Sequence, residues 1–212
     1  HYLKNQGKLL LAFLLTGICL GSTPLFGGDF LVGPKSILVY RNEDRLQKES
    51  QFVLRLGRYR PDIFLEWESL SYQGTLHLYR KAVQEATVFH LSSLFEVGVD
   101  MESRDAMTVW LSEKVYRELT EQGSSKIRLN RLPAKMSLTE EGTFTLTVDK
   151  QVVEIPVIHV EDDRKGFWTF YKNLENPLLV AYRSTYFSQH LKTVSTAPTN
   201  KLRWIHQLPP VK

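Results

Sequence analysis

The chain has 212 residues, of which 42% are hydrophobic and 24% charged, and its formal net charge is +4. This balance excludes a wholly disordered chain, because it supplies enough apolar surface to form a core. Apart from Lys4 and Lys8, 25 basic and 23 acidic residues are interleaved along the chain, as in RNEDRLQKE at 41–49. A nucleic-acid-binding protein gathers its basic residues on one face, so this distribution argues against that class.

The first apolar segment is LLLAFLLTGICLG, the thirteen residues 9–21, which follow Lys4 and Lys8. A helix that crosses a bilayer needs about 20 apolar residues. A basic start, a short apolar run and small residues after it are typical of a cleaved secretory signal. We therefore expect a signal peptide over 1–28 and an exported bacterial protein, periplasmic or secreted. An uncleaved anchor and a first core element of the domain are the alternatives.

Cys19 is the only cysteine of the chain and lies within this apolar run. The preceding residues Leu15–Ile18 differ from a bacterial lipoprotein signal, because Ile18 is bulky and the leucine lies one position too far back. A cysteine buried in the run is the interpretation we favour, and lipidation is the alternative. Removal of the signal would leave a chain without a thiol, and thus without disulfides, thiol catalysis or a cysteine-ligated metal.

Beyond the signal, apolar and polar residues alternate in several stretches, starting with SILVY at 36–40. Further examples are DIFLEWES at 62–69, TLHLYR at 75–80 and TFTLTVD at 143–149. In the first of these, one face carries three apolar side chains: Ile63, Leu65 and Trp67. Alternation of this kind predicts half-buried β-strands.

One segment between the strands, LSEKVYRELTEQG, has the pattern of an amphipathic helix. Ser112 is placed to cap its start and Gly123 to end it, which predicts a helix over about 111–122. Its apolar stripe, spaced by four residues, comprises Leu111, Val115 and Leu119. The stretch RKAVQEA at 80–86 is compatible with a second, shorter helix.

The region 143–194 contains strand patterns that are joined by short polar turns. Asp149-Lys150 separates the first two patterns and predicts a tight hairpin, although lysine disfavours a positive φ angle. Pro156 lies inside the second pattern and is expected at a bulge or an edge, because it has no N–H to donate. We predict one α+β domain over 29–195, with a mostly antiparallel curved sheet and a C-terminal meander. Residues 196–212, with three prolines and no acidic residue, are expected to form a loose tail.

Metal-binding residue types cluster at one strand end, where the candidate ligands are His159, Glu161, Asp162 and Asp163. The stretch EDDRKG also has the composition of an ordinary polar turn, which is the interpretation we favour. The chain lacks the zinc motif H-E-x-x-H and a glycine-rich phosphate loop before a helix. We expect no cofactor.

Catalytic signals are equally sparse, since no G-x-S-x-G motif occurs. Glu66 and Glu68 share a strand face, roughly 7 Å apart by the rise of a strand. They are expected to be solvated glutamates, and a hydrolase built from separated carboxylates or histidines is the alternative.

Aromatic residues alternate through GFWTFY at 166–171, so that both faces of the predicted strand carry rings. One face enters the core, and the other must be covered by a further element or by an apolar ligand. A lipid or a hydrophobic peptide is the ligand class that such a groove would accept. The candidate ligand-binding residues are Trp67, Phe167, Trp168, Phe170 and Tyr171.

Three stretches within about 107–194, VWLSEKVYREL, FTLTVDKQVVEIPVIHV and FWTFYKNLENPLLVAYR, resemble uncharacterised exported bacterial strand-rich domains. In these, a capped helix precedes a meander with an Asn-Pro-Leu strand start, here Asn176–Leu178. The order of signal, strands, helix and meander is also similar to periplasmic curved-sheet domains that hold or carry lipids. Our main functional hypothesis is a non-catalytic exported domain that binds an envelope component, either a lipid or a protein partner. The resemblance supplies no catalytic residue. From the charge distribution and the first apolar segment, we expect no nucleic-acid partner and membrane contact only through an uncleaved signal.

Overall fold

The computed structural model describes residues 25–26 and 32–196. Most of the predicted signal segment and residues 197–212 of the predicted tail therefore lie outside the described residues. Within the described part, the strands form a single 14-stranded sheet, accompanied by two short helices. This arrangement confirms the α+β class and the mostly antiparallel curved sheet.

The N-terminal half contains β1 (Leu25–Phe26), β2 (Ile37–Asp44), β3 (Glu49–Tyr59), β4 (Ile63–Ser69), β5 (Tyr72–Leu78), α1 (Arg80–Glu85), β6 (Val88–Phe89), β7 (Asp100–Ser103) and β8 (Ala106–Met107). The C-terminal half contains α2 (Glu113–Gln122), β9 (Ser124–Leu129), β10 (Leu132–Val148), β11 (Gln151–Asp162), β12 (Phe167–Tyr171), β13 (Leu179–Arg183) and β14 (Phe187–Ser195). β1 lies within the predicted signal segment, yet its backbone pairs in parallel with β11.

Helix α2 has the start, end and buried face that its sequence predicts. The Ser112 hydroxyl accepts a hydrogen bond from the Val115 N–H at 3.2 Å, and Gly123 ends the helix with a φ of 74°. The apolar stripe is buried, as expected: Leu111, Val115 and Leu119. Helix α1 corresponds to the predicted short helix at 80–86.

The predicted meander is present as five successive antiparallel strands, β10 to β14. Asp149 and Lys150 form the tight turn between β10 and β11, and both have positive φ angles, 47° and 70°. Pro156 lies opposite Thr143 on β10, whereas β12 pairs only with 157–161 of β11. The proline therefore lies outside the β11–β12 ladder. At this position no N–H is required for pairing with β12.

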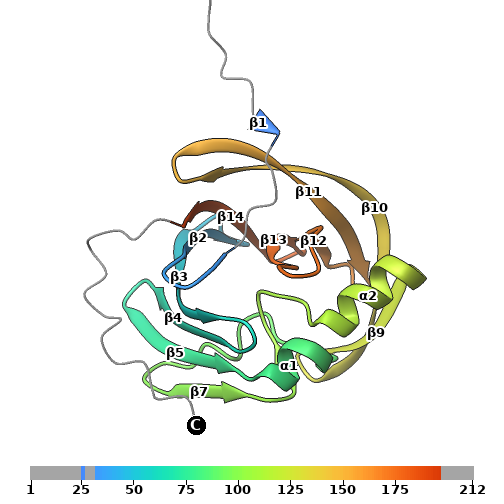
Figure 1. Ribbon diagram of the computed structural model, residues 1–212, viewed down its shortest axis with the longest axis horizontal. Helices are drawn as coiled ribbons and strands as arrows, with labels where there is room; N and C mark the ends of the chain where they lie inside the picture. The colour runs from blue at the N-terminus through green and yellow to red at the C-terminus, as the bar shows by residue number, and fades with distance from the viewer. Residues whose placement is uncertain (1–24, 27–31, 197–212) are drawn as a thin grey trace, which may run out of the picture.

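The sheet curves until its two ends come together (Figure 1). The strand order runs β7-β5-β4-β3-β2-β14-β13-β12-β11-β10-β9-β6-β8, so the pairing of β2 with β14 joins the two halves of the chain. The terminal strands β7 and β8 are consecutive in sequence. Between them the Ser103 hydroxyl donates to the Ala106 carbonyl at 2.9 Å and accepts from the Ala106 N–H at 3.1 Å.

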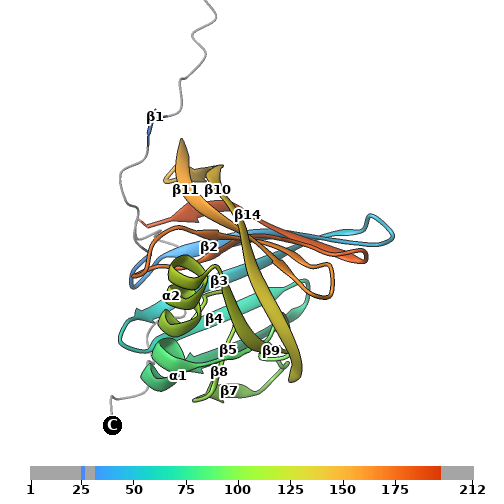
Figure 2. The same ribbon diagram turned by 90° about the vertical axis from the view of Figure 1, so that its right-hand side faces the viewer.

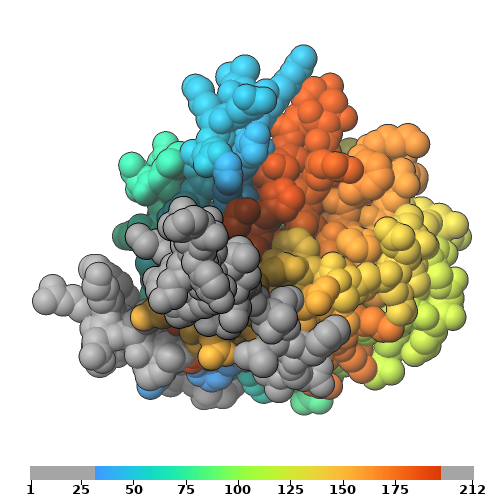
Figure 3. Space-filling view, turned by 90° about the horizontal axis from the view of Figure 1, so that it is seen from above, coloured from blue at the N-terminus to red at the C-terminus, as the bar shows by residue number. Residues whose placement is uncertain are grey.

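The strand registers place the connections at two opposite ends of the curved sheet. One end, the hairpin end, carries the loop 90–99 and five turns: 45–48, 70–71, 130–131, 163–166 and 184–186. The other, the helix end, carries α1 and α2, which lie away from the hairpin turns in Figure 2. The β2–β3 and β13–β14 hairpins project side by side in the space-filling view of Figure 3.

The core lies inside the curve, and the alternation of the predicted strands decides which side chains enter it. Ile63, Leu65 and Trp67 of β4 are buried, while Glu68 is exposed. In the described part of the chain, no helix has both the length and the apolar character required to span a membrane.

Candidate functional site

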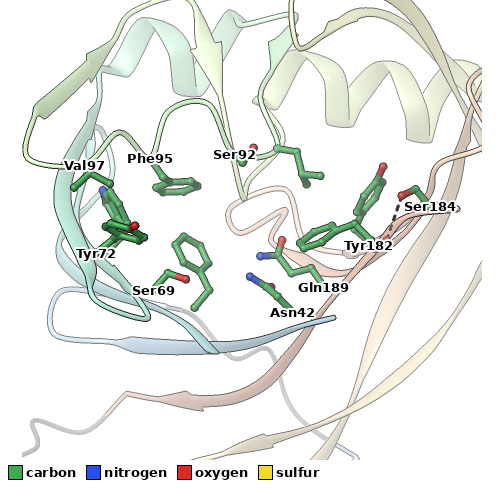
Figure 4. Close-up of a pocket in the computed structure, with 13 residues that line it drawn as sticks. Asn42, Ser69, Tyr72, Ser92, Phe95, Val97, Tyr182, Ser184 and Gln189 are labelled. Carbon is green, nitrogen blue, oxygen red and sulfur yellow. Dashed lines mark hydrogen bonds between the residues drawn. The ribbon is translucent and has the colours of Figure 1, made fainter. Parts of the chain in front are cut away.

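A pocket of about 390 Å³ opens at the hairpin end of the curved sheet (Figure 4). Its walls come from β2, β3, β4, β5, β13 and β14, and part of the loop 90–99 closes it from the opposite side. Strands that are distant in sequence thus contribute to one cavity. Its volume lies within the range of roughly 300–1,000 Å³ that is usual for small-molecule sites.

Six aromatic rings form most of the pocket wall: Phe52, Trp67, Tyr72, Phe95, Tyr182 and Phe187. Phe95 comes from the loop and packs edge-on against Phe52, with ring centroids 4.7 Å apart, and against Trp67 at 5.7 Å. Aromatic pairs in this orientation are favourable beyond the area that they bury. The loop is therefore held over the pocket by ring contacts.

The position of the Trp67 ring depends on a glycine of the neighbouring strand. A Cβ atom at Gly74 would lie 2.8 Å from the Trp67 indole nitrogen, closer than any ordinary contact. Trp67 is only 3% exposed, and its indole N–H has no hydrogen-bond partner. The indole nitrogen lies beside Gly74, which does not line the pocket, so Trp67 offers a ligand its ring rather than its N–H.

Two amide side chains, from Asn42 and Gln189, point into the pocket from neighbouring strands (Figure 4). They are direct partners in the β2–β14 register. Gln189 is buried, and the Asn42 side-chain carbonyl is buried without a hydrogen-bond partner. Because this carbonyl is shielded from the cavity, a ligand hydrogen-bonds with the other polar atoms of the two amides.

Hydroxyl groups supply the remaining polarity of the pocket, and the best defined is that of Tyr182. Burial raises the pKa of Tyr182, a hydrogen bond with Ser184 opposes that shift, and the nearby Asp162 adds to it. Tyr182 therefore stays a neutral phenol at physiological pH.

The lining residues carry no formal charge, since none of them is Asp, Glu, His, Lys or Arg. The pocket thus offers apolar surface, amides and hydroxyls. It has no carboxylate or imidazole that would act as a general base on a bound molecule. Its chemistry suits recognition of an uncharged, mostly apolar molecule.

Of the predicted ligand-binding residues, Trp67 lines this pocket. Trp168, Phe170 and Tyr171 are buried in the core, and Trp168 reaches the back of the wall through Tyr182, at 4.2 Å between ring centroids. Phe167 is 43% exposed outside the pocket. The structure therefore brings one of the five into the cavity and uses three as core.

The residues proposed as metal ligands are not gathered around one point. In the described ranges, no group of three or more His, Cys, Asp or Glu side chains is positioned to hold a metal ion. Asp162 is buried and accepts hydrogen bonds from the Gly166 N–H at 3.0 Å and from the Trp168 indole at 2.8 Å. His159 contacts the Thr169 hydroxyl through Nδ1 at 3.1 Å. Asp162 thus holds the turn 163–166 in place.

Glu66 and Glu68 lie on the face of β4 opposite Trp67, outside the aromatic pocket. Glu68 pairs with Arg55 at 2.9 Å. Burial raises the pKa of Glu66, and the positive charge of Arg55 opposes that shift. The pair lines a shallow depression next to Gln73, in which Arg55 is the nearby cation.

A serine–histidine contact lies beside the pocket in the loop 90–99. The Ser93 hydroxyl is 2.6 Å from His90 Nδ1, and the neighbouring Ser92 lines the pocket. Burial lowers the pKa of His90, and the charge of Arg131 lowers it further. His90 is therefore neutral at physiological pH and able to accept a proton.

Sequence reasoning missed most of this site, including both amides and the whole loop 90–99. The residues come from strands that pair only in the folded chain, so their spacing in sequence carries no signal. One local signal was available in LFEVGV at 94–99, an apolar stretch without a regular strand period. The apolar side chains of such a stretch must pack against another part of the protein. Here Phe95 packs against the rings of the pocket wall.

Comparisons with protein-family models, with curated proteins and with solved structures find no match to this chain. The likeness of 107–194 to exported bacterial domains therefore remains a resemblance of sequence pattern. The chemistry of the pocket is therefore the main indication of what the protein does.

Proposed function

We propose that the protein is a non-catalytic binding protein for an uncharged lipid-like molecule, which the aromatic pocket encloses. The observation that carries the proposal is an apolar cavity with two amides and no charged side chain. A ligand with an apolar body and one or two hydroxyl or amide groups matches this lining. Such a molecule buries its apolar surface against the rings and hydrogen-bonds with the amides of Asn42 and Gln189.

The lack of charge decides between ligand classes. A carboxylate or phosphate in the pocket would lose its hydration without gaining a cation, which is unfavourable. A hydrophobic peptide carries a donor and an acceptor at nearly every residue, and the pocket has too few polar groups to pair them. A neutral lipid-like molecule avoids both costs.

Export is part of the proposal and is supported by the sequence of the first 28 residues. The basic start and short apolar run are typical of a secretory signal. A protein of the cell envelope or exterior would meet lipids and other apolar molecules there. The pocket supports the binding role independently of this location.

A second candidate, an exported hydrolase, is favoured by the contact between Ser93 and His90. A hydroxyl in contact with a neutral imidazole is the first half of a nucleophile–base arrangement. One observation disfavours the hydrolase: Ser93 and His90 are only three residues apart in one loop, where their contact also fixes the backbone. Hydrolysis of a p-nitrophenyl ester by the wild type, and its loss in Ser93→Ala, would support this candidate over the binding protein.

The binding role is tested by titration with monolaurin and with laurate at about pH 8, where laurate is ionised. We expect monolaurin to bind and laurate to bind at least about tenfold more weakly. The variant Ser69→Phe, which places a ring in the pocket, should weaken monolaurin binding by about tenfold or more. Ser71→Phe, on the adjacent exposed turn, is the matched control and should bind as the wild type does. Tight binding of laurate, or equal binding by both variants, would contradict the proposal.

A further inference from the structure

Exposed large hydrophobic side chains gather at the hairpin end. Of nine such residues in the described part of the chain, eight lie on or beside the five turns and the loop 90–99. Each turn contributes at least one, and the most prominent are Leu46, Leu70, Leu132, Phe167 and Tyr186. The ninth, Val152, lies beside the β10–β11 turn at the opposite end of β11. Scattered exposed hydrophobics need no explanation, but a set confined to one end does.

Arginine side chains lie over two of these exposed rings. The Arg45 guanidinium is 5.4 Å from the centre of the Tyr186 ring, and the Arg183 guanidinium is 5.2 Å from that of Phe167. Aromatic rings next to cationic side chains are typical of the membrane–water interface, where rings enter the headgroup region and cations remain near phosphates.

Charged side chains of both signs lie at the hairpin end. Basic side chains are present on four of the five turns or directly beside them: Arg45, Lys48, Arg131, Arg164, Lys165 and Arg183. Acidic residues are as numerous at this end, on or directly beside the turns and the loop 90–99: Asp44, Glu49, Glu96, Asp100, Asp162 and Asp163. Two of them are hydrogen-bonded to the backbone. Asp44 accepts from the N–H groups of Leu46 and Lys48, and Asp162 accepts from the turn that follows it.

The exposed apolar surface is continuous with the mouth of the pocket. Tyr72 and Val97 line the pocket and are also 54% and 52% exposed. A molecule that leaves the pocket therefore passes directly over these side chains. The end that carries the opening is the end that carries the exposed hydrophobics.

We propose that the hairpin end docks on the surface of a lipid bilayer, with the turns inserted among the headgroups. Projecting side chains on separate turns can each enter a fluid bilayer, whereas a protein partner would need a matching cavity for every one. Docking does not require a filled pocket, so the docking proposal can be tested independently of the proposed ligand. It places the pocket opening against the lipid.

Flotation with vesicles of phosphatidylcholine and phosphatidylglycerol tests the docking surface. We expect the wild type to float with the vesicles, and the double variant Leu70→Asp/Tyr186→Asp to lose affinity by about tenfold or more. Val152→Asp alters the exposed hydrophobic residue at the other end and should float like the wild type. Ser69→Phe should also float, even though its pocket is filled.

Two results would overturn the proposal. The first is a wild type that stays with the soluble fraction, or a double variant that floats as well as the wild type does. The second is a concentration-dependent dimer of the wild type that the Leu70→Asp/Tyr186→Asp substitutions abolish without any change in flotation. That second result would assign the hairpin end to a second copy of the chain.

Discussion

Asn42 and Gln189 lie directly opposite each other on β2 and β14, and both amides enter the pocket. This pair joins the first long strand of the domain to the last. Backbone pairing between the two strands therefore fixes the position of Asn42, whose side-chain carbonyl has no hydrogen-bond partner.

The variant Asn42→Leu should separate binding from stability. Monolaurin should bind about tenfold more weakly, because one of the two amides that line the pocket is lost. The free energy of unfolding should stay within about 1 kcal/mol of the wild-type value or rise, since an unsatisfied buried group is removed. Calorimetric titration and urea denaturation measure the two quantities. A large loss of stability with unchanged binding would show that the amide is structural.

Gly74→Ala should destabilise the fold and disturb the pocket. The added Cβ would collide with the Trp67 ring, which must then move, at a cost of about 1–3 kcal/mol. Tryptophan emission should shift as the ring becomes more exposed. Gly33→Ala is the control, because a Cβ there meets nothing within 4 Å, and its unfolding free energy should change by less than about 1 kcal/mol. Equal effects of both changes would argue against a specific contact at Trp67.

Leu119→Ala tests the packing of α2 on the sheet. Leu119 is completely buried, so its truncation should lower the free energy of unfolding by about 2–5 kcal/mol. Leu46→Ala removes the same atoms from a side chain that is 73% exposed and should change stability by less than about 0.5 kcal/mol. Urea denaturation curves of both variants decide the point, and a loss within error for Leu119→Ala would show that the stripe does not contribute.

Stability should fall as the pH drops below about 6.5, the pKa of an unperturbed histidine. Burial, followed by nearby positive charge, lowers the pKa of both His90 and His190. In this range the unfolded chain takes up protons that the folded chain resists, so unfolding is favoured by acid. Thermal unfolding across the pH range should show a shallower acid decline in His90→Asn and in His190→Gln. A wild-type stability that rises on acidification would contradict these shifts.

The sequence was sufficient for the elements whose determinants are local. Ser112, Gly123 and the stripe of α2 are read within one segment, and the alternation in β4 identifies its buried face directly. The Asp149-Lys150 turn was also predictable, although both residues have the positive φ that lysine disfavours.

The closure of the sheet and the pocket were not predictable, because they depend on pairing between distant strands. β2 contributes Asn42 and β14 contributes Gln189, and neither strand carries a sign of its neighbour. The aromatic residues of β12 were misleading for a physical reason: the inner face of this strand is covered by the protein's own core rather than by a ligand, and Phe167 on the other face stays exposed. Trp168 and Phe170 are therefore core residues.

The meeting of the sheet ends at β7 and β8 has a mechanical consequence. These strands are joined by the short link through Arg104 and Asp105, and the loop 90–99 connects β6 to β7 across the same seam. The loop that covers the pocket is thus anchored on both sides of the one junction that interstrand pairing does not close. A change in the width of the cavity at that seam would leave the ladders between the long strands intact.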